Sequence, residues 1–383
     1  MSEAETILTG ARIVLDDAVI TGTVQIIDGR IASVDLGASA VPGAIDVGGD
    51  MILPGLVDVH TDHLEKHVFP RAHVRWDMMR AVMSHDAQII GGGVTTVFDS
   101  LCVGATEKNP ERREILGPML DALEFAGANG MLRAEHLVHL RCEITDDHTP
   151  HLTLANIGRE IVRVISVMEH VPGKRQSRDV GRYVERRMVE SGMSRDVVER
   201  ETRELLESLE ANSIEVRAEV IALAKARALP MFSHDDVTLE HIHLAVEEGI
   251  RVAEFPCSVE AAREARKHSM LTVAGAPNMV RGGSQSGNVA VRDLLAEGLV
   301  DILASDYVPR SMLDCAFMIA GEAELGIDLP AAVRMVTSVP ARACGLADRG
   351  EILPGLLADL IRVHVVDDFP VVRTAWRNGR QVN

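Results

Sequence analysis

From Met51 onward, apolar runs alternate with stretches of helical pattern along the chain. This alternation is typical of a parallel α/β architecture, in which each buried strand is followed by a helix. Eight repeats predict an α/β fold of the (β/α)8, TIM-type barrel class. The candidate strands span residues 53–60, 94–99, 132–143, 162–170, 230–234, 251–255, 271–275 and 300–306.

Both ends of the chain have a different pattern, with short strands separated by turns. Residues 23–27 and 31–34 flank Asp28-Gly29, and an Asp-Gly pair between apolar runs indicates a hairpin. Asn378-Gly379 is a second hairpin signal near the other end. We therefore expect residues 1–50 and 351–383 to form a small β-sandwich domain, and residues 51–350 to form the barrel.

The composition of the chain argues against several classes of function. The chain has 383 residues, of which 46% are hydrophobic, and its formal net charge is 39 − 57 = −18. This charge argues against nucleic acid or an anionic membrane as a partner. No apolar run is long enough for a membrane span, and the N-terminus lacks a signal-peptide pattern. Five scattered cysteines without a CxxC motif suit a reducing cytoplasm and argue against a cysteine-based zinc site.

Metal-ligand side chains gather where the predicted strands end, which is where barrel enzymes place their catalytic groups. His60 and Asp62 follow the first apolar run at alternate positions, so we expect them to share a face of the strand. A lone residue such as Asp99 could equally begin a loop. Burying the whole set together is costly unless a cation offsets its charge. The predicted metal ligands are His60, Asp62, Glu143, His170, His234 and Asp306.

Several segments resemble the amidohydrolase superfamily of metal-dependent hydrolases. They are Pro54-Gly55-Leu56-Val57-Asp58, Gly93-Val94-Thr95-Thr96-Val97, Ser305-Asp306, and Gly355-Leu356-Leu357-Ala358-Asp359-Leu360 with Asn378-Gly379-Arg380. The resemblance covers nearly the whole chain. It implies a distorted (β/α)8 barrel with a small β-sandwich built from both chain ends.

A second set of segments is similar to one branch, the PhnM family of phosphonate metabolism. It comprises His60-Thr61-Asp62-His63-Leu64-Glu65-Lys66-His67, Ser84-His85-Asp86-Ala87, His139-Leu140-Arg141-Cys142-Glu143, Val167 to Gln176, Ser233-His234-Asp235-Asp236, and Gly275-Ala276-Pro277-Asn278 with Arg281-Gly282-Gly283-Ser284. The resemblance implies hydrolysis of α-D-ribose 1-methylphosphonate 5-triphosphate to the 5-phosphate and diphosphate. The chain departs from the expected family pattern at His63, where we expect Asn.

The residues also indicate how such a hydrolase would hold its metal. Many amidohydrolases bridge two metals with a carbamylated lysine, but none of the five lysines closes a predicted strand. Glu143 is the natural substitute, because a carboxylate is anionic and can bridge with two oxygens. Glu254 stands where a sixth-strand histidine is common, and whether it ligates is open. The mixed donor set suits one or two divalent ions, with Zn or Mn favoured over Fe and Mg.

In this interpretation the metal lowers the pKa of a water molecule and polarises a phosphoryl oxygen. Asp306 is the candidate general base. His234 and His170 either ligate the metal or stabilise charge, and His234 is taken as catalytic together with Asp306.

A small anionic, phosphorylated substrate needs local positive charge against the global field. Two segments supply candidates, one after the first strand and one after the fourth, and a glycine-rich stretch after the seventh strand offers backbone N–H groups to an anion. The predicted substrate-binding residues are Lys66, His67, Lys174, Arg175, Gln176, Asn278, Arg281 and Ser284. A surface loop is the alternative for the glycine-rich stretch.

Two other functions are compatible with the sequence. One is an amidohydrolase that cleaves a C–N bond of a cyclic amide or N-acyl substrate, and the other is a non-catalytic binding protein on the same scaffold. The charged helical stretch 194–209 could form a lid or a subunit contact, so a homo-oligomer is left open.

Overall fold

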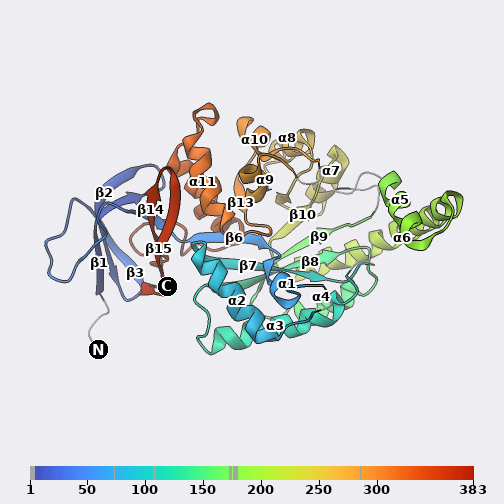
Figure 1. Cartoon of the computed structure of the whole chain (residues 1–383), viewed down its shortest axis with the longest axis horizontal. Helices are drawn as coiled ribbons and strands as arrows, with labels where there is room; N and C mark the ends of the chain where they lie inside the picture. The colour runs from blue at the N-terminus through green and yellow to red at the C-terminus, as the bar shows by residue number, and fades with distance from the viewer. Residues whose placement is uncertain (1–4, 73, 107–108, 172–174, 176–179, 285–286) are drawn as a thin grey trace.

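The computed structural model describes residues 5–72, 74–106, 109–171, 175, 180–284 and 287–383. Figure 1 shows a barrel surrounded by helices, with a sheet built from both chain ends at one side. Helices α5 (Val180–Ser191) and α6 (Arg195–Ala226) project at the opposite side.

Eight parallel strands form the barrel in sequence order, as predicted. They are β6 (Leu56–Thr61), β7 (Val94–Val103), β8 (Glu135–Glu143), β9 (Val162–Met168), β10 (Met231–His234), β11 (Val252–Glu254), β12 (Leu271–Gly275) and β13 (Ile302–Ala304). The first and last strands meet through the backbone beyond β13. Asp306 N donates to His60 O at 2.9 Å, and Asp62 N donates to Asp306 O at 2.9 Å. Two predicted metal-ligand segments thus close the barrel.

Alternate strand residues face the barrel interior, as the twofold period of a strand requires. On β8, Leu137 packs into the interior cluster with Val59 and Phe232, whereas Val138 and Leu140 pack outward against the helices. The same alternation places His139, Arg141 and Glu143 on the inner face. The barrel interior is therefore apolar toward the amino ends of the strands and polar at their carboxyl ends.

Helices surround the barrel and connect successive strands. Several begin at a side-chain cap, for example Asp77, which accepts a hydrogen bond from Arg80 N at 3.0 Å. The remaining helices are α1 (His63–Val68), α2 (Met78–Gly91), α3 (Arg112–Ala128), α4 (Thr149–Asn156), α7 (Leu239–Glu247), α8 (Val259–Lys267), α9 (Ala276–Arg281), α10 (Val291–Ala296), α11 (Ser311–Gly321), the 3-10 helix η1 (Ala323–Leu325), α12 (Leu329–Arg334) and α13 (Ser338–Ala343). Among the described residues, no helix is both long and apolar enough to cross a membrane.

The two chain ends meet in one mostly antiparallel sheet (Figure 1). Its strands are β1 (Glu5–Val14), β2 (Val19–Ile27), β3 (Arg30–Leu36), β4 (Ile45–Asp46), β5 (Met51–Pro54), β14 (Leu360–Val366), β15 (Phe369–Arg377) and β16 (Arg380–Gln381). Both predicted hairpins are present, because β2 pairs with β3 and β15 pairs with β16 in antiparallel register. The predicted union of the two chain ends is confirmed.

Three predicted features differ in detail. The first apolar run is divided between β5, in the terminal sheet, and β6, in the barrel. Asp99 does not close a strand but lies inside β7, which continues to Val103. Asn278 and Arg281, which were expected in a glycine-rich stretch that offers backbone N–H groups to an anion, lie in the short helix α9, and the glycines follow the end of this helix.

Candidate metal centre

Glu254 joins two of the predicted metal ligands at the carboxyl end of the barrel. His60 Nδ1 donates to Glu254 Oε1 at 2.6 Å, and His234 Nδ1 donates to Glu254 Oε2 at 2.7 Å. The two imidazole rings are nearly parallel, with centroids 5.7 Å apart. All three side chains are buried.

These hydrogen bonds fix the protons of both histidines on Nδ1, so each Nε2 carries a lone pair. A carboxylate behind an imidazole is the usual device for orienting a metal-binding histidine. Each oxygen of Glu254 accepts a hydrogen bond from one of these imidazoles. Its contacts are therefore those of a residue that positions two predicted ligands.

His139 and Arg141 also reach the barrel interior, although the sequence reasoning gave neither a role in the site. His139 Nδ1 donates to Val59 O at 3.0 Å. Ligand atoms of His60, His139 and Glu254 lie within 4.8 Å of one another. The signal that could have identified both residues is their alternation with Glu143 on one predicted strand.

Three buried ligand atoms at this end of the barrel lack a hydrogen-bond partner among the described residues. They are His60 Nε2, His139 Nε2 and Asp62 Oδ1. Unpartnered buried polar atoms are costly, and native proteins contain few of them. Two imidazole nitrogens and a carboxylate oxygen are donors that a divalent cation such as Zn²⁺ accepts. The residues present therefore fit a divalent metal.

Glu143 and His170 form a pair of their own. His170 Nδ1 donates to Glu143 Oε2 at 2.5 Å, and the Thr145 hydroxyl donates to Glu143 Oε1 at 2.6 Å. Burial raises the pKa of Glu143, but these hydrogen bonds and the His170 charge outweigh it and lower the pKa below its ordinary value. Glu143 is thus an anion whose two oxygens are both hydrogen-bonded in this structure.

A second donor group lies beside this pair. Ligand atoms of His170, His234 and Asp235 lie within 4.8 Å of one another. Burial lowers the pKa of His234 to about 3, which the Glu254 hydrogen bond opposes only in part. Imidazoles and carboxylates thus line both candidate metal positions.

Asp306 has the electrostatic setting of a proton acceptor. Burial, together with the nearby negative charge of Asp62, raises its pKa to about 7. Burial likewise raises the pKa of Asp235 to about 6. Carboxyl groups with pKa values near neutral can exchange protons at neutral pH.

Of the predicted phosphate contacts, Lys66 lies beside the site. Its Nζ donates to Tyr307 O at 3.2 Å and lies 4.8 Å from the centre of the Tyr307 ring. Lys66 is exposed, and its charge lowers the pKa of the adjacent Asp306. It therefore supplies positive charge next to the candidate base.

Arg175 is placed differently from the prediction. Its side chain is buried, and Nη1 donates to Asp236 Oδ1 at 2.9 Å and to His234 O at 2.7 Å. Nε donates to Glu169 Oε2 at 3.2 Å. These contacts engage the guanidinium inside the protein, so it braces the end of β10 and the loop that follows His234, and is not presented to a phosphate.

The other predicted substrate contacts are dispersed. Asn278 braces the backbone, since its Oδ1 accepts from Val291 N at 3.0 Å and its Nδ2 donates to Val289 O at 3.3 Å. Arg281 is exposed at the end of α9, and Ser284 lies just beyond it. His67 lies on α1 with its ring against that of His63. Lys174 and Gln176 lie outside the described residues.

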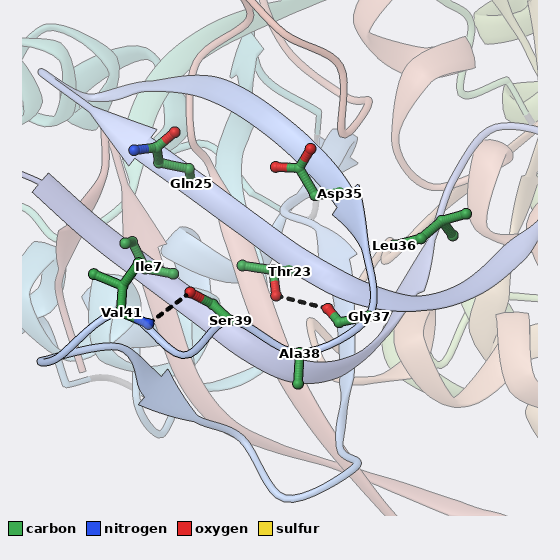
Figure 2. Close-up of a pocket in the computed structure, with 9 residues that line it drawn as sticks. All are labelled: Ile7, Thr23, Gln25, Asp35, Leu36, Gly37, Ala38, Ser39 and Val41. Atoms are coloured by element: carbon green, nitrogen blue, oxygen red, sulfur yellow. Dashed lines mark hydrogen bonds between the residues drawn. The ribbon is translucent and has the colours of Figure 1, made fainter.

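A pocket in the terminal sheet is unrelated to this centre. Figure 2 shows its lining from β1, β2, β3 and the following loop, where Thr23 Oγ1 donates to Gly37 O and Val41 N donates to Ser39 Oγ. None of the lining residues is a predicted site residue. They are Ile7, Thr23, Gln25, Asp35, Leu36, Gly37, Ala38, Ser39 and Val41.

Comparisons with known proteins agree with this architecture. Residues 51–382 match the amidohydrolase family. The chain is 39% identical over 376 residues to the alpha-D-ribose 1-methylphosphonate 5-triphosphate diphosphatase of Escherichia coli (strain K12), which covers 98% of this chain and 100% of that protein.

Solved structures are similar in fold at much lower identity. The 5-methylcytosine deaminase from Klebsiella pneumoniae has a TM-score of 0.65 at 16% identity, covering 99% of this chain and 98% of that chain. The N-isopropylammelide isopropylaminohydrolase from Burkholderia multivorans has a TM-score of 0.64 at 18% identity, with the same coverage of 99% and 98%. At these identities, the two structures support the fold alone.

Proposed function

The chain belongs to the amidohydrolase family and is a metal-dependent hydrolase, and from this premise we propose that it hydrolyses α-D-ribose 1-methylphosphonate 5-triphosphate. The products of this reaction are the 5-phosphate and diphosphate, with one water consumed for each phosphoanhydride bond broken. The observation that carries the proposal is the 39% identity, over nearly the whole chain, to a diphosphatase that is named for this substrate.

The metal would be held by the imidazoles and carboxylates at the carboxyl end of the barrel. We propose His60, Asp62, Glu143, His170, His234 and Asp306 as ligands, as the sequence predicts, and add His139 because its Nε2 is buried without a partner among the described residues. When bound, a divalent cation supplies Lewis-acid polarisation of a phosphoryl oxygen and lowers the pKa of water. Glu254 orients His60 and His234 for this task.

Asp306 would take the proton of the attacking water. Its raised pKa of about 7 suits a base that must accept a proton near neutral pH and release it after the products leave. The backbone on both sides of Asp306 is tied to the first strand, through Asp306 N to His60 O and Asp62 N to Asp306 O. These two bonds hold the carboxyl group in register with the ligands on that strand.

Positive charge for the phosphate chain would come from Arg141 and Lys66. Arg141 is buried on the inner face of β8, its Nη1 is 3.9 Å from Asp62 Oδ2, and its Nε has no hydrogen-bond partner among the described residues. A desolvated guanidinium is well suited to an oxygen that gains negative charge as the bond to phosphorus breaks. Lys66, at the exposed rim, would neutralise the outer phosphates.

The test compares two Asp→Asn changes at residues with similar backbone geometry. Asp306 and Asp367 both have positive φ, at 55° and 48°, which Asn tolerates well. Asp306→Asn should abolish most diphosphate release from the triphosphate substrate, whereas Asp367→Asn, in an exposed turn, should leave it unchanged. If the Asp306→Asn variant releases diphosphate at the same rate as the wild type, Asp306 does not act as the base. Hydrolysis of a cyclic amide without any diphosphate release would replace the proposed reaction.

A further inference from the structure

Three histidines gather outside the barrel wall, where α1 packs against α2. His63 and His67 are four residues apart on α1 and therefore share a face of the helix. His85 comes from α2 and is buried. The ring centroids of His63 and His67 are 4.8 Å apart, and those of His85 are 5.5 Å and 5.9 Å from these two rings.

A buried carboxylate lies behind His85. His85 Nε2 donates to Asp99 Oδ1 at 2.6 Å, while the other oxygen of Asp99 accepts from His136 Nδ1 at 2.7 Å. The proton of His85 is thus on Nε2, and its Nδ1 lone pair is directed at His63 Nδ1, 3.3 Å away. A carboxylate that orients an imidazole in this way is the usual support of a histidine metal ligand.

One pair of these nitrogens has the spacing of two ligands on a tetrahedral ion. One ligand atom from each of the three histidines lies within 4.8 Å of the others. Two ligands of a tetrahedral zinc with Zn–N bonds of 2.0–2.1 Å are about 3.3 Å apart, which equals the distance between His63 Nδ1 and His85 Nδ1. His67 Nε2 is buried and has no hydrogen-bond partner among the described residues.

We propose that His63, His67 and His85 form a second metal site that binds Zn²⁺ through three imidazole nitrogens, with water in the fourth position. It shares no side chain with the metal centre at the carboxyl end of the barrel, which we call the barrel-mouth centre. Asp99 contacts His85 and His136 on the outer side of β7, whereas its neighbours Phe98 and Ser100 face inward, Phe98 in the interior cluster and Ser100 against His139.

The zinc would clamp α1 onto α2. Because α1 begins directly after Asp62, the clamp would fix the segment that leaves the first barrel strand. The inference goes beyond the proposed reaction and does not depend on it. The competing interpretation is a plain hydrogen bond between His63 and His85, which needs no metal.

The test measures bound zinc in the full-length wild type and in the full-length His67→Gln variant. Each protein is stripped with a chelator, reloaded with Zn²⁺, freed of excess metal and analysed for zinc per chain. His67→Gln should hold one zinc fewer than the wild type, and zinc should raise its Tm less. His151→Gln, which changes an exposed histidine on α4, should match the wild type.

The same pair in a His60→Asn background separates this site from the barrel-mouth centre. There too, His67→Gln should remove one zinc, even if the protein releases no diphosphate. Circular dichroism checks that each variant is folded. Equal zinc content in both members of each pair would overturn the proposal and leave the hydrogen-bond interpretation.

Discussion

Replacement of Glu254 by Gln tests the role of the carboxylate that His60 and His234 share. Gln has nearly the same shape but only one acceptor oxygen, so its NH2 group must face one of the two imidazole N–H groups. That histidine can relieve the clash only by moving its proton to Nε2, the nitrogen that would bind the metal. The variant should therefore fold normally and bind metal poorly.

The magnitude follows from the number of hydrogen bonds lost. One of the two buried bonds, 2.6 and 2.7 Å long, is forfeited, and a hydrogen bond to a charged group contributes about 1.5–3 kcal/mol. Loss of a carboxylate behind a metal ligand typically weakens metal binding about 10–100-fold, or about 1.4–2.7 kcal/mol. The free energy of the lost hydrogen bond and the free energy of the weakened metal binding thus agree.

The assay is the Kd for Zn²⁺ or Mn²⁺, measured by competition with a chelating dye on stripped protein. Glu297→Gln is the control, because it also removes a hydrogen-bonded carboxylate, from an exposed pair with Arg263. The control should bind metal like the wild type. An unchanged Kd in Glu254→Gln would refute the orienting role.

Two substitutions and one pH series test the fold around the site by chemical denaturation. Arg175→Ala leaves the buried carboxylate of Asp236 without its ion-pair partner, and the free energy of unfolding should fall by about 3–5 kcal/mol. Burial lowers the pKa of His136, but two neighbouring carboxylates outweigh burial and raise the pKa from 6.5 to about 9. The protonated form is therefore favoured by folding. Its contribution to the free energy of unfolding should be complete below pH 6.5 and be lost as the pH rises through 9. Gly55→Ala would push a Cβ into the Thr95 side chain and should cost about 1–3 kcal/mol.

Each of these three tests has a matched control variant and a result that would contradict it. Arg263→Ala removes an exposed ion pair and should cost at most about 1 kcal/mol, so an equal loss in both arginine variants would contradict the buried role of Arg175. His136→Asn should lose the fall in stability between pH 6.5 and 9, and a persisting fall would assign it to another group. Gly91→Ala has open space around its Cβ, so a comparable loss there would contradict the steric argument.

The barrel was predictable because the hydrophobic pattern carries it. Eight apolar runs separated by helical stretches gave all eight strands, and Asp-Gly and Asn-Gly gave the terminal hairpins. Errors lie at strand ends, where periodicity is weakest. Asp99 was expected at the end of a strand, but hydrogen bonding to β8 extends β7 to Val103.

The contacts within the site depend on distances that one sequence does not encode locally. Glu254 links residues on strands far apart in the chain, and its partners follow only from barrel closure. Arg175 lies in a basic segment that suggested phosphate binding, yet folding brings it onto Asp236 and Glu169. The His63, His67 and His85 cluster likewise requires the packing of α1 on α2.

The most direct measurement is diphosphate release from the triphosphate substrate by one preparation, before metal removal, after stripping and after reloading with Mn²⁺ or Zn²⁺. We predict release by the metal-loaded protein, its loss on stripping and its return on reloading. Equal release by stripped and loaded protein, or none from protein with metal bound, would contradict the account.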